Sequence, residues 1–284
     1  MLYIVGTPIG NYLDISERAK EVLRSVDLIA CEDTRETGIL MKAIEAQGKL
    51  ISYHEHNRAA REKTILENLS AGKDIALVSD AGMPCISDPG VELVRLCVEN
   101  NIPVTSIPGP TAFVTALSLS GIDTRRFTFE GFIPAEGKER KARLRAIMES
   151  EITVVIYEAP HRLIKTLSEM ISLGMGGREV AVSRELTKKY EQVIRGTVAE
   201  AATNFSGQAP KGEFVLVIGK PVSENFVEKV AEEKNIDARI IDLADQGFST
   251  REISSILAEE LSVSKNVIYS KALMVLKYRK EQKG

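Results

Sequence analysis

The sequence predicts an α/β protein with a parallel sheet in its first part, a mixed sheet in its second part and a small helical extension at its end. Up to residue 112, short apolar runs alternate with segments of helical periodicity, which is typical of strand–loop–helix units in a parallel sheet. From residue 127 onward, apolar runs follow one another with fewer helical segments between them, which indicates a mixed sheet. Beyond residue 221 the pattern is helical, and Ser249 and Glu252 have the spacing of a capping box.

These patterns suggest three segments. The chain has 284 residues, of which 44% are hydrophobic, so it can bury a substantial core and is long enough for about two domains. We expect an N-terminal parallel α/β domain over 1–118, a second α/β domain over 119–220 and a helix-turn-helix-like extension over 221–284. A stretch of small residues before Gly121 marks the first boundary, and Lys220-Pro221 marks the second.

Each element is predicted from its own periodicity and flanking turns. The first five strands are expected at 2–5, 27–31, 50–53, 75–78 and 103–107, and the helices between them at 14–24, 37–44, 58–69 and 91–98. Later strands are expected at 127–132, 153–157, 179–183, 191–198 and 213–219. A basic helix starts near Lys138, the capping box opens a helix over 253–261, and a Lys-rich helix reaches Lys280.

Composition excludes several classes of protein. The net charge of −3 provides no overall basic field, so contact with nucleic acid would depend on local patches. Cys31, Cys85 and Cys97 are odd in number and lack C-x-x-C spacing, which argues against disulfides and a zinc site and fits a cytoplasmic protein. His54 and His56 lack further metal ligands nearby, so no metal is expected. The first residues lack the basic region, long apolar stretch and cleavage site of a signal peptide, so none is expected, and no apolar run approaches the ~18 residues of a membrane span.

Polar clusters follow every predicted strand of the first sheet. They lie at 6–11, 32–35, 54–57, 79–88 and 108–112. Carboxyl ends of parallel strands share one edge of the sheet, so these clusters are expected to form one rim with a ligand site. The loop after the fourth strand, with Asp80, Ser87 and Asp88, is the favoured ligand wall. Gly6 and Gly10 imitate a dinucleotide loop, but their spacing is wrong and a proline intervenes, so NAD is not expected.

Two basic segments have two interpretations each. Five cations between Lys138 and Arg145 could contact phosphates, or could form an ordinary solvated helix face. The lysines of the last helix could contact nucleic acid, or could belong to a plain trihelical cap.

Nine short motifs in order resemble one known family. They lie at 5–11, 31–35, 52–57, 78–90, 107–112, 130–132, 157–162, 184–188 and 195–197. Together they resemble the ribosomal RNA small-subunit methyltransferase I family of the tetrapyrrole methylase superfamily, which methylates a cytidine 2′-oxygen of 16S rRNA with S-adenosylmethionine. Met83, Cys85 and Ala159 depart from the pattern, where Thr, Gly and Ser are common.

The resemblance implies the superfamily's two-domain class III methyltransferase fold, an S-adenosylmethionine cofactor, the small ribosomal subunit as partner, and a homodimer. The cofactor positions of the superfamily fall on Pro8, Ser79, Asp80, Ala81, Gly82, Cys85, Thr111, Ala112, Glu158, Leu186 and Phe214. A methylase of a tetrapyrrole intermediate and a helix-turn-helix regulator remain as alternatives; the first would leave the basic segments without a polyanion.

The chemistry of methyl transfer restricts the remaining candidates. A ribose hydroxyl is a poor nucleophile until its proton leaves, so a general base is useful. The candidates are Asp80 and the proposed catalytic residues Glu32, Asp33, His54, His56, Glu185 and Lys188. RNA contacts are predicted for Arg35, Lys138, Arg140, Lys141, Arg143, Arg162 and Arg184. For Arg35, Arg162 and Arg184 the alternative is a salt bridge to one of the acids.

Overall fold

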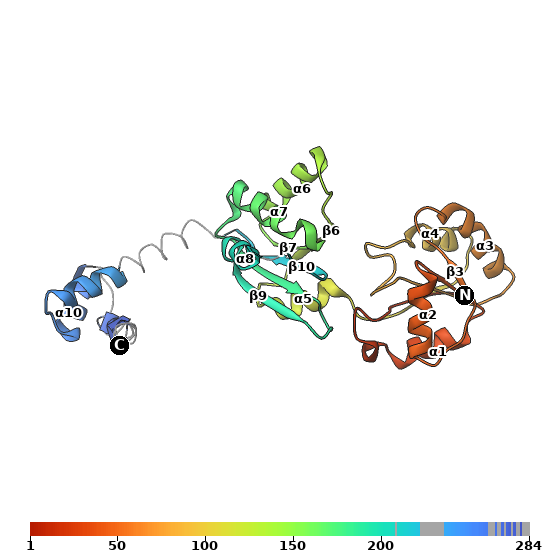
Figure 1. The fold of residues 1–284 in the computed structure, drawn as a ribbon, viewed down its shortest axis with the longest axis horizontal. Helices are drawn as coiled ribbons and strands as arrows, with labels where there is room; N and C mark the ends of the chain where they lie inside the picture. The colour runs from red at the N-terminus through yellow and green to blue at the C-terminus, as the bar shows by residue number, and fades with distance from the viewer. Residues whose placement is uncertain are drawn as a thin grey trace. The chain divides into compact units, whose positions relative to one another are not determined.

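The computed structural model describes residues 1–207, 209–221, 236–260 and, near the C-terminus, 265, 268–269, 271–273, 275–276 and 279. The chain forms two compact units, Met1–Pro221 and Val222–Gly284 (Figure 1). The first unit contains two five-stranded sheets, and the second is helical in its described part.

The first sheet is parallel, as predicted. Its strands are β1 (Leu2–Val5), β2 (Leu28–Cys31), β3 (Leu50–Ser52), β4 (Ile75–Val78) and β5 (Val104–Ile107), in the order β3-β2-β4-β1-β5. Every neighbouring pair runs parallel. The connection that follows β1 leads toward β2 on one side of the sheet, and the connection that follows β4 leads toward β5 on the other side. The carboxyl ends of the neighbouring strands β1 and β4 therefore flank the crevice in which such folds bind ligands.

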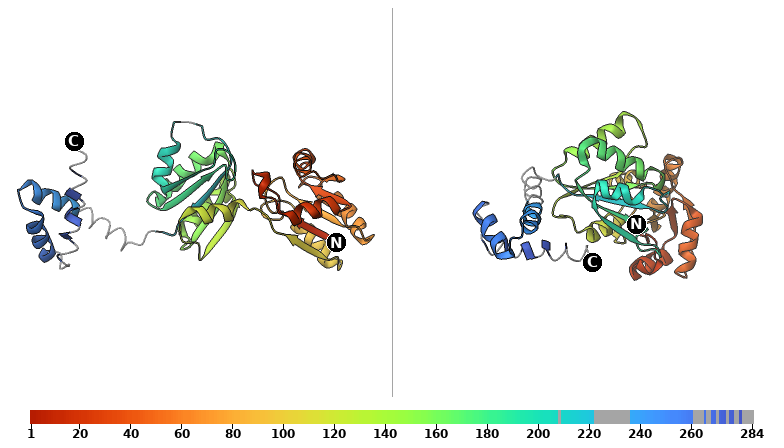
Figure 2. Two further views of the ribbon diagram at one scale, coloured as in Figure 1. Left: turned by 90° about the horizontal axis from the view of Figure 1, so that it is seen from below. Right: turned by 60° about the vertical axis from the view of Figure 1, so that its left-hand side comes forward.

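Helices cover both faces of this sheet (Figures 1 and 2). They are α1 (Glu17–Ser25), α2 (Thr34–Ala43), α3 (Arg58–Ser70) and α4 (Val91–Glu99), and a short 3₁₀ turn precedes α1 at Tyr12–Asp14. Side chains alternate along each strand, so Val5 packs with α1 and α2 on one face, and Leu2 and Ile4 pack with α3 and α4 on the other. Burial on both faces explains why the strands read as continuous apolar runs.

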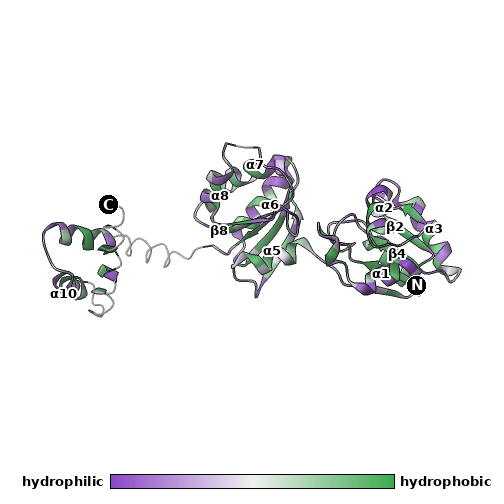
Figure 3. Cartoon of the chain, turned by 60° about the horizontal axis from the view of Figure 1, so that its bottom comes forward, coloured by the Kyte–Doolittle hydropathy of each residue, from purple (hydrophilic) through white to green (hydrophobic). Residues whose placement is uncertain are grey.

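The second sheet is mixed, which confirms the prediction. Its strands are β6 (Phe127–Phe132), β7 (Thr153–Glu158), β8 (Glu179–Arg184), β9 (Gln192–Thr197) and β10 (Phe214–Ile218), in the order β6-β7-β10-β8-β9. β6 and β7 pair in parallel, and the other pairs are antiparallel. Figure 3 shows hydrophobic residues along the strands of both sheets.

The second sheet has more helices than its sequence indicated. They are α5 (Ala112–Ser120), α6 (Gly137–Glu149), α7 (Pro160–Met170) with a π-helical turn at Ile171–Met175, and α8 (Val198–Phe205). α6, α7 and α8 share a hydrophobic core on one face, and α5 packs against β7, β8 and β10 on the other. The predicted boundary between residues 118 and 119 falls inside α5, whose contacts are with the second sheet; the division of this unit into two domains stays a prediction.

The second unit has its own small core. Ile240 and Leu243 of the helix over 236–245 pack with Ile253 and Leu257 of α10 (Thr250–Glu260). The capping box is confirmed, since Ser249 N donates to Glu252 Oε2 at 2.8 Å and Glu252 N donates to Ser249 Oγ at 3.4 Å.

Two cations of the predicted Lys-rich helix form ion pairs within this unit. Lys271 contacts Asp237 at 3.2 Å and Arg279 contacts Asp245 at 2.8 Å. Lys277 and Lys280 lie outside the described residues.

In the part of the chain that the structure describes, no helix combines the length and the apolar character needed to cross a lipid bilayer.

Candidate active site

Loops from β1, β4 and β5 are joined at the rim of the first sheet. Thr7 and Gly82 exchange backbone hydrogen bonds of 2.8 and 3.2 Å, and Gly6 N donates to Ile107 O at 3.0 Å. A Cβ on Gly6 would lie 2.7 Å from the backbone N of Gly109, so the two loops approach more closely than any side chain allows. The predicted convergence of polar loops on one rim is therefore confirmed for these three strands.

The loop after β4 has an unusual backbone. Gly82 has a φ of 88°, and the non-glycine residues Cys85 and Ser87 have φ values of 70° and 67°. A left-handed conformation costs an L-residue about 1–2 kcal/mol, so the surrounding contacts must hold the loop in this shape. Such strain is concentrated at ligand sites.

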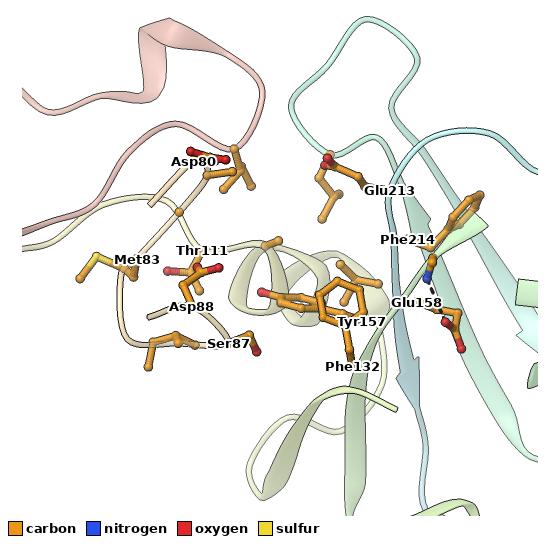
Figure 4. A pocket seen from close by; sticks show the side chains of 18 of the residues that line it. Asp80, Met83, Ser87, Asp88, Thr111, Phe132, Tyr157, Glu158, Glu213 and Phe214 are labelled. Carbon is orange, nitrogen blue, oxygen red and sulfur yellow. Dashed lines mark hydrogen bonds between the residues drawn. The ribbon is translucent and has the colours of Figure 1, made fainter. Parts of the chain in front are cut away.

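A cavity of about 380 Å³ opens beside this loop (Figure 4). Its walls come from loops of both sheets: Ile9 and residues 80–83 and 86–88 at the first sheet, Thr111 and Ala112 at the start of α5, and Phe132, residues 157–160, Leu186 and residues 213–215 at the second. The volume and the mixture of apolar walls with a few carboxyl groups are typical of a small-molecule site.

The carboxyl groups on the first-sheet side influence one another. Burial raises the pKa of Asp88 to about 7, the negative charges of Glu32 and Asp80 add to this effect, and a hydrogen bond from Ser79 opposes it. Burial also raises the pKa of Asp80, whose Oδ1 accepts a 3.0 Å hydrogen bond from Asp33 N. Burial and the charge of Asp80 raise the pKa of Glu32. Three carboxyl groups that hold protons more tightly than usual therefore surround one edge of the site.

The structure separates Asp33, His54 and His56 from the cavity lining. Asp33 accepts hydrogen bonds from Arg35 Nε and Nη2, and these bonds lower the pKa of Asp33 to about 2. For Arg35, the salt-bridge alternative is thus the one observed. His54 contacts Asn57 and His56 is exposed. Glu32 does not line the cavity either and acts on it only through its charge.

Glu185 and Lys188 form an ionic cluster with Glu213. Lys188 Nζ lies 3.2 Å from Glu185 Oε1 and 3.0 Å from Glu213 Oε2. Burial opposes ionisation of Glu185, but hydrogen bonds from the backbone of Glu213 and from Lys188 outweigh it and lower its pKa. Burial of Lys188 is likewise outweighed by its bonds to Glu213 and Glu185, which raise its pKa. Neither group is suited to accept a proton at neutral pH.

Most of the predicted cofactor positions come together. Asp80, Ala81, Gly82, Thr111, Ala112, Glu158, Leu186 and Phe214 all line the cavity, whereas Pro8, Ser79 and Cys85 do not. Ser79 supports the loop from behind through a 3.3 Å hydrogen bond to Gly82 O.

Glu158 contributes no free carboxylate to the cavity. Its oxygens accept from Thr166 and from Ala159 N at 2.9 Å, and Arg162 Nε lies 3.0 Å away. In Figure 4 the carboxylate of Glu158 points away from Asp88. Arg162 thus forms a salt bridge, but with Glu158 and not with one of the candidate catalytic acids.

Several lining residues were not singled out from the sequence as site residues: Ile9, Met83, Ile86, Phe132, Tyr157, Ala159, Pro160, Glu213 and Val215. Phe132 ends the edge strand β6, and Tyr157 lies one residue before the end of its neighbour β7. Both belong to the motifs at 130–132 and 157–162, so the motifs and an aromatic residue near a strand end were the available signals.

The predicted RNA-binding cations differ in their exposure. Lys138 and Lys141 are exposed on α6, and Arg143 lies 3.0 Å from Glu130. Arg184 Nε donates to Lys211 O at 2.6 Å.

The prediction for Arg140 is wrong. This side chain is 2% exposed and donates to Glu169 at 2.8 Å, to Thr166 at 2.8 Å and to Pro134 O at 3.0 Å. Arg140 lies on the inner face of α6 and is therefore part of the core. Because it stands in a run of charged residues, the helical period of the sequence did not reveal this position.

Across the described residues, no group of three or more His, Cys, Asp or Glu side chains is placed to hold a metal ion.

Comparison with known proteins gives consistent matches. Residues 1–202 match the family model of tetrapyrrole (corrin/porphyrin) methylases. The chain is 45% identical to ribosomal RNA small subunit methyltransferase I of Synechocystis, over 96% of this chain and 97% of that protein. It is 42% identical to the protein of the same name from Bacillus subtilis, over 95% and 92%.

The fold has solved counterparts. One is a uroporphyrin-III C-methyltransferase of Thermus thermophilus in complex with S-adenosylhomocysteine. It aligns with a TM-score of 0.56 and 18% identity, over 77% of this chain and 96% of that one. At this identity the likeness concerns the fold alone.

Proposed function

The chain belongs to the ribosomal RNA small subunit methyltransferase I family of the tetrapyrrole methylases, and we propose that it transfers the methyl group of S-adenosylmethionine to a cytidine ribose 2′-oxygen of 16S rRNA. The observation that carries this proposal is that loops of both sheets line one cavity, with eight of the eleven predicted cofactor residues in its wall. A tetrapyrrole substrate is not favoured, because relatives that match nearly the full length share the rRNA methyltransferase name.

The residues of the cavity fit this cofactor. Leu186, Phe214 and Val215 offer apolar walls to an adenosyl group, and Thr111 together with the carboxyl of Asp80 offers polar partners to its hydroxyl and amino groups. The cofactor supplies an electrophilic methyl group on a positively charged sulfur. The negative rim around Asp80 and Asp88 complements that charge.

The protein's own task is to position the acceptor and take up a proton. Alignment of the ribose oxygen with the methyl group can supply several kcal/mol of the rate enhancement (roughly 7–11 kcal/mol at most). Among the carboxyl groups that line the cavity, Glu158 is bound by Thr166 and Arg162, and Glu213 is paired with Lys188. Asp80 and Asp88 each accept one hydrogen bond, from Asp33 N and from Ser79, and we propose Asp88 as the base because burial raises its pKa despite the bond from Ser79. A pKa of about 7 is close to the value at which a general base works best near neutral pH.

The RNA partner is proposed to contact the exposed cations of α6. Lys138 and Lys141 point to solvent and have no acidic partner among the ion pairs of the described residues. Such cations neutralise phosphates at low cost. The homodimer and the cytoplasmic location that the resemblance implies also belong to this proposal; light scattering on the purified protein tests the dimer.

One assay tests the proposal as a whole. The protein is incubated with radiolabelled S-adenosylmethionine and, in separate reactions, with small ribosomal subunits, naked 16S rRNA and uroporphyrinogen. We expect label only in rRNA, in a nucleotide that resists alkaline hydrolysis because its 2′-oxygen is methylated. Asp88→Asn should lower kcat by about 10²-fold or more, whereas Glu99→Gln on the exposed face of α4 should have no effect. Label in uroporphyrinogen, or none in rRNA, would contradict the proposal.

A further inference from the structure

We propose that Phe132, supported by Tyr157, is a stacking platform for the base of the nucleotide that receives the methyl group. This inference rests on the proposed function and names the part of the site that holds its RNA substrate. Phe132 lies in the wall of the cavity, and yet its side chain is exposed to solvent.

The ring of Phe132 is held in place while much of it remains open. Its centroid lies 5.4 Å from that of Tyr157, which lies 4.9 Å from Phe129, which in turn stacks on Phe113 at 4.4 Å. Despite this support Phe132 is 54% exposed. In Figure 4 Phe132 and Tyr157 share one wall of the pocket, across from Ser87 and Asp88. A fixed aromatic surface loses little entropy on binding, which suits it to stacking.

The backbone that carries Phe132 is enclosed by basic side chains. Arg143 donates to Glu130 O at 3.1 Å, Arg162 donates to Ile133 O at 3.3 Å, and Lys165 donates to Ala135 O at 3.4 Å. These bonds fix the end of β6. Arg143 and Arg162 are also paired with Glu130 and Glu158, whereas the exposed Lys165 has no acidic partner among the ion pairs of the described residues. Lys138 and Lys141 follow on α6. An aromatic ring flanked by cations is the combination that binds single-stranded nucleic acid, because bases stack while phosphates are neutralised.

The exposure of Phe132 favours the acceptor base over the adenine of the cofactor. A small cofactor is buried over most of its surface, so the walls that hold it are expected to be enclosed. Leu186 and Phe214 are such walls, since both are buried in the protein. A polynucleotide must instead leave the cavity on both sides of the target nucleotide. A platform at the solvent edge, next to cations, therefore suits the RNA.

The same strand provides a matched control. Phe127 begins β6, is 41% exposed, and also contacts Phe113, with ring centroids 6.3 Å apart. It does not line the cavity. Phe132→Ala and Phe127→Ala remove the same side chain from one strand, but only the first removes the platform.

Kinetics with small ribosomal subunits tests the role in binding. Loss of base–aromatic stacking should raise KM for the subunit by about 5- to 150-fold in Phe132→Ala. S-adenosylmethionine affinity and the melting temperature should stay near those of the wild type, and Phe132→Tyr should retain activity. Phe127→Ala should leave KM unchanged. An unchanged KM in Phe132→Ala, or a weakened dimer in light scattering without a change in KM, would overturn the proposal.

Fluorescence tests the contact itself and does not depend on turnover. The chain has no tryptophan, so Phe132→Trp and Phe127→Trp each introduce a single indole reporter. Single-stranded oligocytidylate should quench the emission of Phe132→Trp and leave that of Phe127→Trp unchanged. Quenching by S-adenosylhomocysteine alone, without further quenching by RNA, would assign the ring to the cofactor and overturn the proposal. If the wild type fails to methylate rRNA, the proposed function fails, and the quenching experiment still decides whether this ring binds a base.

Discussion

Replacing Asp88 by asparagine should stabilise the protein, and the gain should grow as the pH rises. The pKa of Asp88 is raised from 3.8 to about 7 by burial and by the charges of Glu32 and Asp80. The folded state therefore holds this proton more tightly than the unfolded state, and ionising the group costs folding free energy. The cost appears above pH ~4, increases until pH ~7 and is constant beyond that.

The size of the effect follows from the shift. About three pKa units correspond to roughly 4 kcal/mol at 1.36 kcal/mol per unit, but Asp88 is partly exposed, and solvent screening reduces this to about 1–2 kcal/mol. Asparagine has no charge and nearly the same volume, so Asp88→Asn should gain this amount at pH 8 and clearly less at pH 5. For a unit of this size, such a gain in the free energy of unfolding corresponds to a rise of about 2–8 °C in Tm.

Urea denaturation of both proteins at pH 5 and pH 8, followed by circular dichroism, measures the difference. Asp123→Asn is the control of opposite sign, since hydrogen bonds from Arg125 lower the pKa of Asp123 and its contribution to stability is present at pH 8 and lost as the pH falls. The control should therefore gain nothing at pH 8. A gain in Asp88→Asn that is equal at both pH values would refute the reasoning, because it would show that the carboxyl costs stability through its shape and not through its charge.

Three further predictions concern the cofactor and the core. Gly82→Arg should abolish S-adenosylmethionine binding in calorimetry with the fold retained, because Gly82 lines the cavity at a φ of 88°; undiminished affinity in a folded variant would remove the loop from the site. Arg178→Met should cost about 3 kcal/mol or more in urea denaturation, because this buried side chain donates to Ile147 O at 2.7 Å and Ser150 O at 2.9 Å, and a loss below about 1 kcal/mol would show that water replaces it. Binding of S-adenosylmethionine, a cation, should release protons when calorimetry in two buffers is compared, whereas S-adenosylhomocysteine should release fewer; equal release would show that the rim does not sense the cofactor's charge.

The first sheet was predictable because its local signals agree. β1 and β4 have the predicted bounds, and the other three strands differ by one residue at an end. Each strand is a short, largely apolar run that ends in a polar or turn-forming cluster, and helical segments follow the first four strands. The rim followed from topology, because parallel strands bring their carboxyl ends to one edge.

The helices of the second sheet were harder to detect for a specific reason. α5 consists of apolar and small residues on nearly every side, because it lies against the sheet and beside the loop of Ile9, so it has no polar face to mark a period. α7 starts with Pro160 after a strand end, which looks like a turn in sequence although proline is well tolerated at a helix start.

The electrostatics of the site could not be predicted from the sequence, because they depend on distances between side chains that no sequence motif contains. Arg140 belongs to a basic run, but only the packing of α6 shows that it is buried and paired with Glu169. Cys85 stands where glycine was expected, and its φ of 70° gives the physical reason for that expectation, since glycine adopts such angles without strain. Similarly, Asp88 was seen as a loop acid, but its raised pKa arises from burial, from Glu32, which lies far away in sequence, and from Asp80 of the same loop.

The acidic rim costs folding free energy, and the positive charge of the proposed cofactor gives a reason for keeping it. Glu32, Asp80 and Asp88 hold their protons more tightly than free carboxyls do, because burial and, in addition, repulsion between neighbouring negative charges destabilise their ionised forms in the empty site. A methylsulfonium cation relieves that repulsion, and methyl transfer removes the cation and restores it. The rim should therefore favour the cofactor before transfer over the neutral product after it, which speeds product release. The same change of charge raises the proton affinity of Asp88 as the ribose hydroxyl loses its proton, so a rim that costs stability would assist the reaction at the step where the base acts.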